Sequence, residues 1–474
     1  MADVTRELLR DFNIFMLGYV IVLDFVFLLL VVLGWRAVNA YVARRPFRDY
    51  KQVGESELSM PVSILVPAYN EGPVIVSSIR SLLSSQFSQL EVVVINDGSS
   101  DNTMESLIDA FDLVRVDRVP RANLPCEPIS SVYVSSSDSR IVVLDKANGG
   151  KADSLNAGIR YARYPLFCAI DADTMLDPGA LARLVWEFQA APSTVAVGGI
   201  VRVVNGSEVD GDGRLVQVRT PRGMLVNLQI VEYLRAFLGG RIGWSRLGML
   251  LIISGAFGLF RRDVVVEAGG YDTTTVGEDA ELVLRLHRHQ RDHKRKCRIT
   301  FFPDPICWTE APADFKTFVS QRDRWQRGLI EMMIRHRGMT ARKRYGGVGM
   351  VAIPYFIFFE LLGPVFEVLG WVACISGLAV GAISFPFALA ILGFSISLGL
   401  MISFAVLLME ERAFRRYPDW KDLRRMITAA FVENLGYRQL NTLIRVRAWW
   451  TLFHSDGWGE MTRVGLEQAE IAEA

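Results

Sequence analysis

Two of the short apolar runs in this sequence are followed by carboxylates. Asp171-Ala172-Asp173 follows the run 166–170, where a turn after a strand can bring both side chains to one ligand. A hard cation such as Mg²⁺ or Mn²⁺ prefers oxygen ligands and keeps positions open for phosphate oxygens. We therefore predict that Asp173 binds a Mg²⁺ or Mn²⁺ ion that bridges a diphosphate, and that Asp171 contacts a sugar or ribose. The alternative is that these aspartates only make turn contacts at a strand end.

Three other segments predict contacts to a nucleoside and its phosphates. Tyr69 and Glu71 follow the run 62–66, and they could hold a base by stacking and hydrogen bonding. Asp97 follows the run 90–95, where it could meet the nucleoside, while Asp101 just beyond it could equally be a helix N-cap. Lys151, preceded by Asn-Gly-Gly, opens a predicted helix, and backbone amides with a lysine at a helix start suit an anion. An ordinary glycine loop is the alternative for this last segment.

A further carboxylate stands at the start of a predicted helix. Gly277-Glu278-Asp279 precedes a helical pattern that begins at Ala280. We predict that Asp279 is a general base, which removes a proton from an acceptor hydroxyl. The alternative is that these acidic residues only complement the dipole of the helix.

One face of a later amphipathic helix carries Gln321, Arg324 and Trp325, because these positions are spaced at i, i+3 and i+4. Arg324 could meet the charge of a departing phosphate, and Trp325 could stack on a sugar ring. The alternative is an interfacial belt of Trp and Arg, which is common beside lipid.

The elements that must position these residues alternate between strand and helix. Short runs rich in bulky apolar residues predict buried parallel strands at 62–66, 90–95, 140–144 and 166–170. Helical patterns lie between them at 74–83, 101–111 and 152–162. This alternation predicts a doubly wound α/β sheet, in which ligands bind outside the carboxyl ends of the strands. Two segments depart from it: we expect an excursion at 117–139 and a hairpin or exposed loop at 205–222.

Long apolar blocks near the two ends predict membrane spans. The block 12–33 is too long for a signal-peptide core, so we expect a retained transmembrane helix, and the blocks 348–380 and 385–408 predict a hairpin of two spans. Basic residues flank these blocks, which places the intervening domain in the cytoplasm. Asp24, Glu360 and Glu367 lie inside them and should face protein. The polar stretch 426–446 predicts a membrane-associated helix whose crossing stays open.

Composition excludes several other classes of protein. The chain has 474 residues and a net charge of +1, so no global charge favours nucleic acid. Its 5 cysteines form no CxxC pair, so neither a zinc site nor a disulfide framework is indicated, and we expect buried or lipid-facing thiols.

Taken in order, the DGS, DAD, ED and QxxRW elements resemble the membrane-bound family-2 glycosyltransferases, such as the hyaluronan, cellulose, chitin-oligosaccharide and poly-N-acetylglucosamine synthases. The resemblance covers roughly 61–335. It implies an α/β GT-A fold, a Rossmann-like nucleotide-diphospho-sugar transferase domain in the cytoplasm, joined to α-helical transmembrane segments. The usual TED reads Gly277-Glu278-Asp279 here, which keeps the base and changes its neighbour.

Roles for individual residues also come from this resemblance. Asp97 would contact the uridine end of the donor, Asp173 the metal, and Asp279 would be the base of an inverting displacement. The acceptor and diphosphate would be lined by Gln321, Arg324 and Trp325. Ser254-Gly255-Ala256 looks like the acceptor-side loop of the family, which makes Ser254 and Gly255 candidate substrate contacts.

We therefore expect a membrane anchor at 1–50, a catalytic domain at 51–335, further membrane helices at 336–454 and a tail at 455–474. The expected activity is inverting transfer from a UDP-sugar, UDP-N-acetylglucosamine being the best single donor, to a growing β-linked polysaccharide at a bacterial-type inner membrane. The alternatives are transfer of a single sugar to a lipid or short glycan, and a catalytically silent nucleotide-binding scaffold. Expected partners are the donor, a glycan or lipid-linked acceptor, membrane lipid and subunits for export or assembly, without nucleic acid.

Overall fold

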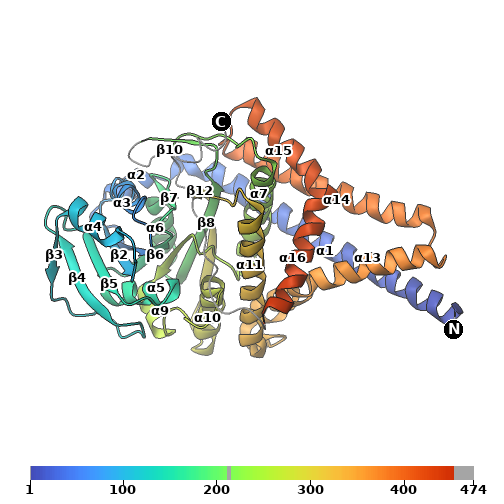
Figure 1. The fold of residues 1–474 in the computed structure, drawn as a ribbon, viewed down its shortest axis with the longest axis horizontal. Helices are drawn as coiled ribbons and strands as arrows, with labels where there is room; N and C mark the ends of the chain where they lie inside the picture. The colour runs from blue at the N-terminus through green and yellow to red at the C-terminus, as the bar shows by residue number, and fades with distance from the viewer. Residues whose placement is uncertain (1, 211–214, 453–474) are drawn as a thin grey trace.

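The computed structural model describes residues 2–210 and 215–452, which form an α/β part and a set of long apolar helices (Figure 1). The α/β part is built on one mixed sheet, with 10 strands among the described residues. In spatial order the strands are β3 (Leu113–Val116), β4 (Ile129–Ser135), β5 (Ile141–Lys146), β2 (Leu90–Asp97), β1 (Val62–Ala68), β6 (Leu166–Ile170), β11 (Phe257–Arg261), β8 (Thr194–Val203), β12 (Arg298–Thr309) and β7 (Met175–Leu176).

The four strands predicted from the sequence are confirmed as β1, β2, β5 and β6. They are parallel neighbours, with Val62 opposite both Leu90 and Leu166. Nearly every residue in them is buried, because helices cover both faces of a parallel sheet. The predicted helices between them are α3 (Ile75–Leu83), α4 (Thr103–Phe111) and α5 (Lys151–Tyr161). The carboxyl ends of these strands therefore meet at one edge, where the candidate residues are.

The rest of the sheet departs from a purely parallel, doubly wound arrangement. Strand β11 runs antiparallel between β6 and β8, and β12 is parallel to β8. The expected excursion at 117–139 was wrong in part, because it contains β4, which pairs antiparallel with β3 and β5. Serines interrupt the apolar pattern of β4 and concealed it. The expected hairpin at 205–222 is confirmed by β9 (Glu208–Val209) and β10 (Leu215–Gln217).

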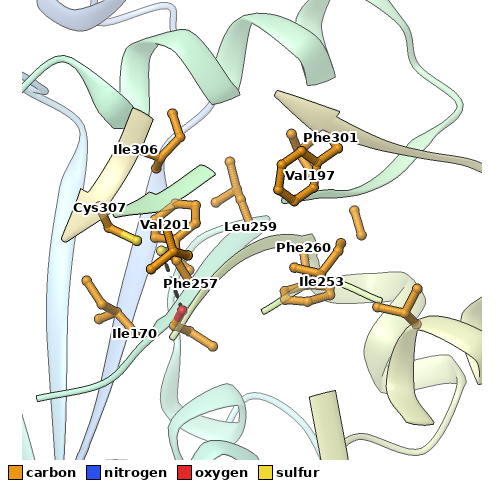
Figure 2. Close-up of a cluster of buried hydrophobic side chains, with 14 of the residues drawn as sticks. Ile170, Val197, Val201, Ile253, Phe257, Leu259, Phe260, Phe301, Ile306 and Cys307 are labelled. Carbon is orange, nitrogen blue, oxygen red and sulfur yellow. Dashed lines mark hydrogen bonds between the residues drawn. The ribbon is translucent and has the colours of Figure 1, made fainter. Parts of the chain in front are cut away.

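A dense apolar cluster lies beneath the Asp171-Ala172-Asp173 turn and the Ser254-Gly255-Ala256 loop (Figure 2). Ile170 ends β6 immediately before Asp171, and Phe257 begins β11 immediately after Ser254-Gly255-Ala256. Both are at most 1% exposed, and they stand opposite each other in the antiparallel register. The core therefore fixes the spacing between the DAD turn and the Ser-Gly-Ala loop.

Further helices complete the α/β part and lead to its membrane side. They are α2 (Tyr50–Glu55), α6 (Ala180–Ala190), α7 (Met224–Leu234), η2 (Arg235–Arg241), α8 (Ile242–Arg246), α9 (Arg262–Glu267), α10 (Glu278–Asp292) and α11 (Phe315–Arg335).

Two helices are long and apolar enough to cross a membrane by length and composition, namely α1 (Ala2–Arg44) and α14 (Phe385–Ala413). A third span is added if η5 to η6 (348–361) and α13 (Gly363–Ala379) count as one, although they are bent by 46° at the break. The predicted block 348–380 is therefore broken rather than straight. The turn between α13 and α14 confirms the predicted hairpin, which projects to the right in Figure 1.

Helix α1 also packs into the α/β part. Its residues Leu30, Val38 and Tyr41 belong to the main buried core, and the Tyr41 hydroxyl donates to Asp304 Oδ2 at 2.7 Å. A Cβ on Gly34 would lie 2.3 Å from the carbonyl oxygen of Leu238, so α1 touches η2 through bare backbone.

The expected single helix at 426–446 is wrong. It is two helices, α15 (Trp420–Val432) and α16 (Arg438–Thr451), joined by η7 (Glu433–Tyr437). The kink lies at Leu435 and at Gly436, whose φ of 126° favours glycine. Neither helix is among the candidate spans of the described chain.

The ionisable residues inside the apolar helices face protein, as expected. Asp24 interacts electrostatically with Arg438 of α16. Arg445 contacts Glu360, and the Thr442 hydroxyl donates to Glu367 Oε2 at 2.9 Å. All five cysteines are free thiols, of which Cys168 and Cys307 are buried as expected, whereas Cys126 and Cys297 are partly exposed outside the apolar helices. The tail 455–474 lies outside the described residues.

Candidate active site

The loops after β1 and β2 hold each other at the carboxyl edge of the sheet. The Asn70 amide donates to Ser99 Oγ at 3.0 Å, and the Ser100 amide donates to Asn70 Oδ1 at 2.9 Å. The Glu71 amide donates to Thr103 Oγ1 at 3.0 Å. Tyr69 stays 53% exposed at this edge, where a base could stack on its ring.

Asp97 shapes the turn that precedes Lys151. Its carboxylate accepts hydrogen bonds from the Gly149 and Gly150 amides at 3.0 and 2.8 Å, and from Lys146 Nζ at 2.5 Å. Both oxygens are thus already engaged within the protein, and Asp97 is 3% exposed. The structure therefore gives this residue a turn-holding position, and its predicted contact with a nucleoside remains a prediction.

Lys151 brings the DAD turn and the Ser-Gly-Ala loop together. It is the first residue of α5, where its Nζ pairs with Asp171 and donates to the Gly255 carbonyl at 3.0 Å. Burial alone would lower the pKa of Lys151, but the nearby carboxylates, Asp171 foremost, outweigh it and leave the pKa raised. Lys151 is therefore a cation at neutral pH.

The predicted base lies beside this lysine. A cavity of about 10 Å³, room for roughly one water, is lined by Lys151, Ser254, Gly255, Tyr271, Glu278 and Asp279. A Cβ on Gly255 would lie 3.0 Å from Asp279 Oδ2 and 3.4 Å from Lys151 Nζ. The structure thus gathers Asp279, Lys151, Asp171, Ser254 and Gly255, which come from four different segments.

Glu278 is a second carboxyl in this cavity. It is 4% exposed, and burial raises its pKa to about 7, opposed by Lys151 and reinforced by Asp279. We identified it in the sequence only as part of a helix start. The Glu278 carboxyl can therefore bind and release a proton near neutral pH.

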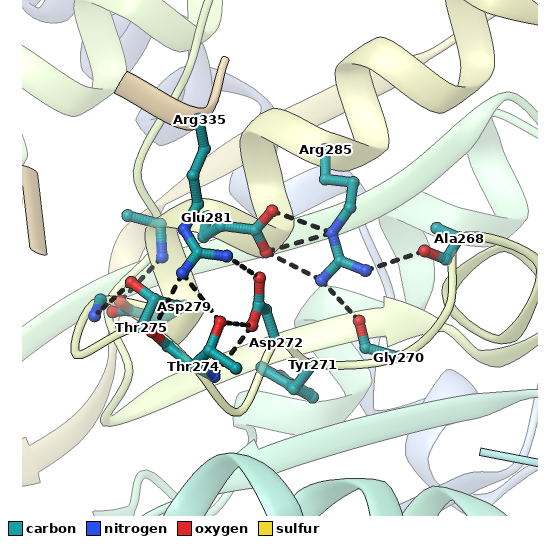
Figure 3. Close-up of polar contacts among 12 residues, drawn as sticks. Ala268, Gly270, Tyr271, Asp272, Thr274, Thr275, Asp279, Glu281, Arg285 and Arg335 are labelled. Atoms are coloured by element: carbon teal, nitrogen blue, oxygen red, sulfur yellow. Dashed lines mark hydrogen bonds and ion pairs between the residues drawn. The ribbon is translucent and has the colours of Figure 1, made fainter. Parts of the chain in front are cut away.

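Arginines hold the loop that precedes α10, the helix that carries Asp279 (Figure 3). Arg285 donates to the carbonyls of Ala268 and Gly270 at 2.8 and 2.6 Å while it pairs with Glu281. Arg335 of α11 pairs with Asp272. Helices α10 and α11 also meet through bare backbone, because a Cβ on Gly328 would lie 2.9 Å from the Gly277 Cα.

Trp325 stands on α11 together with Gln321 and Arg324, so the predicted face is present. It is 46% exposed, and its ring lies 6.2 Å from that of Tyr233. Arg322, which the sequence did not single out, lies 4.4 Å over the Trp325 ring and donates to Glu232 at 2.9 and 3.1 Å. Its burial as part of this contact could not be inferred from spacing.

Arg241 is another residue that the sequence did not reveal. Arg241 is the last residue of η2, and the Asp279 carboxylate attracts its positive charge. Burial lowers its pKa to about 10, so it stays charged at neutral pH, and its Nη1 has no partner among the described residues. It adds positive charge near Asp279.

Asp173 follows Asp171 at the end of β6, where Thr174 Oγ1 lies 3.5 Å from its Oδ1. Within the described residues, no three His, Cys, Asp or Glu side chains form a group that could hold a metal. Mg²⁺ is commonly held by one or two carboxylates together with the phosphates of a substrate. The donor set around Asp173 fits that mode rather than a preformed protein cage.

The chain belongs to a known class of enzymes. A family model described as "Glycosyltransferase like family 2" matches residues 60–328, more than half of the chain, so this protein is a family-2 glycosyltransferase with a Rossmann-like mixed α/β domain. A poly-β-1,6-N-acetyl-D-glucosamine synthase of Staphylococcus epidermidis is 28% identical over 296 residues, 62% of this chain and 61% of the relative. One from Staphylococcus aureus (strain COL) is 30% identical over 277 residues, 58% of this chain and 56% of the relative.

The chain thus covers 61% of the length of the first of these curated relatives. Among solved structures, the mannosyltransferase PcManGT from Pyrobaculum calidifontis, in complex with GDP-Man and Mn²⁺, has a TM-score of 0.49 at 19% identity. That likeness covers 88% of this chain and 99% of the other.

Proposed function

We propose that this protein is an inverting glycosyltransferase that extends a β-linked polysaccharide from a UDP-sugar, with UDP-N-acetylglucosamine as donor. The observation that carries the proposal is the meeting of Asp279 with Lys151 across Gly255. Sugar transfer from a nucleotide donor needs a base for the acceptor hydroxyl and positive charge for the leaving diphosphate. Asp279 and Lys151 could supply these at the carboxyl edge of an α/β sheet, where such sheets bind nucleotides. The names of the curated relatives support a polymer of N-acetylglucosamine.

In the proposed reaction, Asp279 accepts the proton of an acceptor hydroxyl as that oxygen forms a bond to the anomeric carbon. The bond from this carbon to the diphosphate breaks, its electrons leave with UDP, and the configuration inverts. Lys151 and Arg324 stabilise the charge that grows on the diphosphate. A Mg²⁺ or Mn²⁺ ion held by Asp173 would supply further charge neutralisation there.

The remaining predicted residues would orient the substrates. Tyr69 and Glu71 would hold the uracil base, Asp97 would contact the uridine end, and Asp171 would contact sugar or ribose. Trp325 would stack on the acceptor sugar, as its half-exposed ring permits. Gln321 would line the same site. Ser254 and Gly255 would limit the space between acceptor and base.

We also propose that the protein is an integral membrane protein of an inner membrane with its catalytic side in the cytoplasm. Helices α1 and α14 supply the spans, and exposed apolar side chains along them suit contact with lipid. Subunits for export or assembly would join on this side of the molecule.

UDP release measures the proposed activity. In lipid nanodiscs, with a panel of UDP-sugars, an oligosaccharide acceptor and Mg²⁺ or Mn²⁺, we expect release with one donor. Asp279→Asn should lower it by about 10²–10⁴-fold while UDP binding is kept, since general bases contribute about that much. Sizing the product separates a polymer from single-sugar transfer. Folded protein that binds UDP but releases none from any donor would contradict the proposal and favour a silent scaffold.

A further inference from the structure

An open cleft lies at the β3–β4 edge of the sheet, the end opposite β7. Its volume is about 280 Å³, close to the lower limit of about 300 Å³ for small-molecule sites. The side chains that line it include Arg115, Arg118, Ser131 and Tyr161. Figure 1 shows β3 and β4 at the end of the molecule far from α13 and α14.

Positive charge gathers behind this cleft. The positive charges of Arg121 and Arg163 repel that of Arg118, and Arg121 likewise repels Arg262. The carboxylate that these arginines share is Glu91. Four guanidinium groups thus lie within electrostatic range of one another, with Glu91 as their shared carboxylate and Asp263 as a further one beside Arg262.

Glu91 is already engaged by other groups. Its Oε1 accepts from the Ser63 hydroxyl and from the Arg163 amide, both at 2.5 Å. Its Oε2 lies 3.6 Å from the Arg163 side chain. The remaining arginines therefore keep an excess of positive charge.

Two of these arginines lack expected partners. In the described part of the chain, Arg118 makes no hydrogen bond or ion pair, and it is only half-exposed. The Nη2 atom of Arg262 is buried and has no hydrogen-bond partner there either. Burial lowers the pKa of both residues, and Glu91 offsets this only in part. Arg262 still donates through Nε to the Ile159 carbonyl at 3.0 Å, whereas Arg118 lines the cleft, where an anion would supply the acceptors that it lacks.

We propose that this cleft binds the phosphate of a small soluble phosphate ester, such as a nucleotide or sugar phosphate. A planar guanidinium fork matches two phosphate oxygens, and the Ser131 hydroxyl can add a third donor. Asp117 also lines the cleft, but it is exposed, so water screens its charge. The distance from the apolar helices in Figure 1 favours a soluble ligand over a lipid headgroup.

The cleft is also connected to the donor side of the enzyme. The loop after β3 leads to Glu127, whose amide donates to Asp153 Oδ2 at 2.9 Å. Asp153 pairs with Lys146 at 2.7 Å, and Lys146 pairs with Asp97 at 2.5 Å. The loop that borders the cleft is thus tied to the turn before Lys151.

Calorimetry on the full chain in nanodiscs tests the site, with UDP and Mg²⁺ at saturation so that the donor site is filled. Inorganic phosphate and adenosine 5′-monophosphate are the probes. We expect single-site binding that weakens at least tenfold in Arg118→Gln and also falls with added NaCl. Arg80→Gln, an exposed arginine on α3, should bind like the unaltered protein.

Three outcomes would overturn the proposal: no binding to the unaltered protein, equal binding by Arg118→Gln, or binding that UDP abolishes. If Arg118→Gln does not fold, Ser131→Asp provides a second variant, because it places a negative charge on the cleft wall. It should bind phosphate at least tenfold more weakly, and unchanged binding would count against the site.

Discussion

Glu278 is a residue of the active-site cavity whose pKa lies near neutral pH because of its surroundings. A carboxyl whose pKa is raised by burial binds its proton more tightly in the folded than in the unfolded protein. Its contribution to stability is therefore complete below the unfolded pKa of about 4.3 and is lost as pH rises toward about 7. Above pH 7 the buried charge has to be tolerated next to Asp279.

Replacing Glu278 with glutamine removes this titration. We expect Glu278→Gln to lose less stability than the unaltered protein between pH 5 and 8, by up to ~3 kcal/mol, as a shift of over two pKa units implies. Thermal unfolding in nanodiscs at several pH values measures it. Glu57→Gln, at an exposed position, should follow the unaltered protein. Parallel curves for Glu278→Gln would show that the group does not titrate in this range.

At the scale of elements, the contact between α10 and α11 joins the helix of the proposed base, Asp279, to the helix that carries Trp325. Gly277 and Gly328 face each other with no side chain between them. We expect Gly328→Ala to destabilise the fold by about 1–3 kcal/mol through overpacking, less about 1 kcal/mol for better helix propensity. It should also slow UDP release, because α10 carries Asp279.

The melting temperature and UDP release of this variant are the readouts. Gly338→Ala is the matched control, since a Cβ there meets nothing within 4 Å. If Gly328→Ala matches the control in both readouts, the close approach of the two helices does not depend on the missing side chain of Gly328.

The same scale shows what the sequence could predict. Continuous apolar runs marked β1, β2, β5 and β6, and the turns after them located Lys151 and Asp171 correctly at one edge. Strands β8 and β11 were not predicted, because the antiparallel insertion of β11 between β6 and β8 depends on contacts far apart in the chain. Likewise, the sequence pattern around Gly436 predicted a continuous helix and did not reveal the positive φ of this residue, which breaks it.

Side-chain partners were the least predictable part of the site. The motif spacing showed that Arg324 and Trp325 share a face with Gln321, and Arg322 is likewise an i, i+3 neighbour of Trp325. The pairing of Arg322 with Glu232, by contrast, follows from tertiary packing. The buried environment of Glu278 has the same origin. Residue type and spacing indicated the chemistry, whereas burial and charge balance required the assembled fold.

At the scale of the whole molecule, a buried ion pair links the sheet to the apolar helices. Arg202 of β8 pairs with Glu410 near the end of α14, and their side chains are 2% and 3% exposed. Glu410→Ala would leave the Arg202 charge buried and alone, and we expect a loss of about 3–5 kcal/mol of stability.

Thermal unfolding in nanodiscs checks this link. Glu411→Ala is the control, because Glu411 pairs with the exposed Arg415 and such pairs contribute little. Equal melting temperatures for Glu410→Ala and Glu411→Ala would mean that the buried pair does not couple the two parts.

Helix α1 has a practical consequence for handling this enzyme. At 43 residues it is about 65 Å long, and one end contributes Val38 and Tyr41 to the interior of the catalytic part. Removing the whole of α1, through Arg44, would strip the Tyr41 hydroxyl from the buried Asp304 and open the core beside β12. The boundary between the apolar helices and the α/β part therefore lies inside α1, and a truncation for expression should keep the C-terminal turns of this helix that belong to the core.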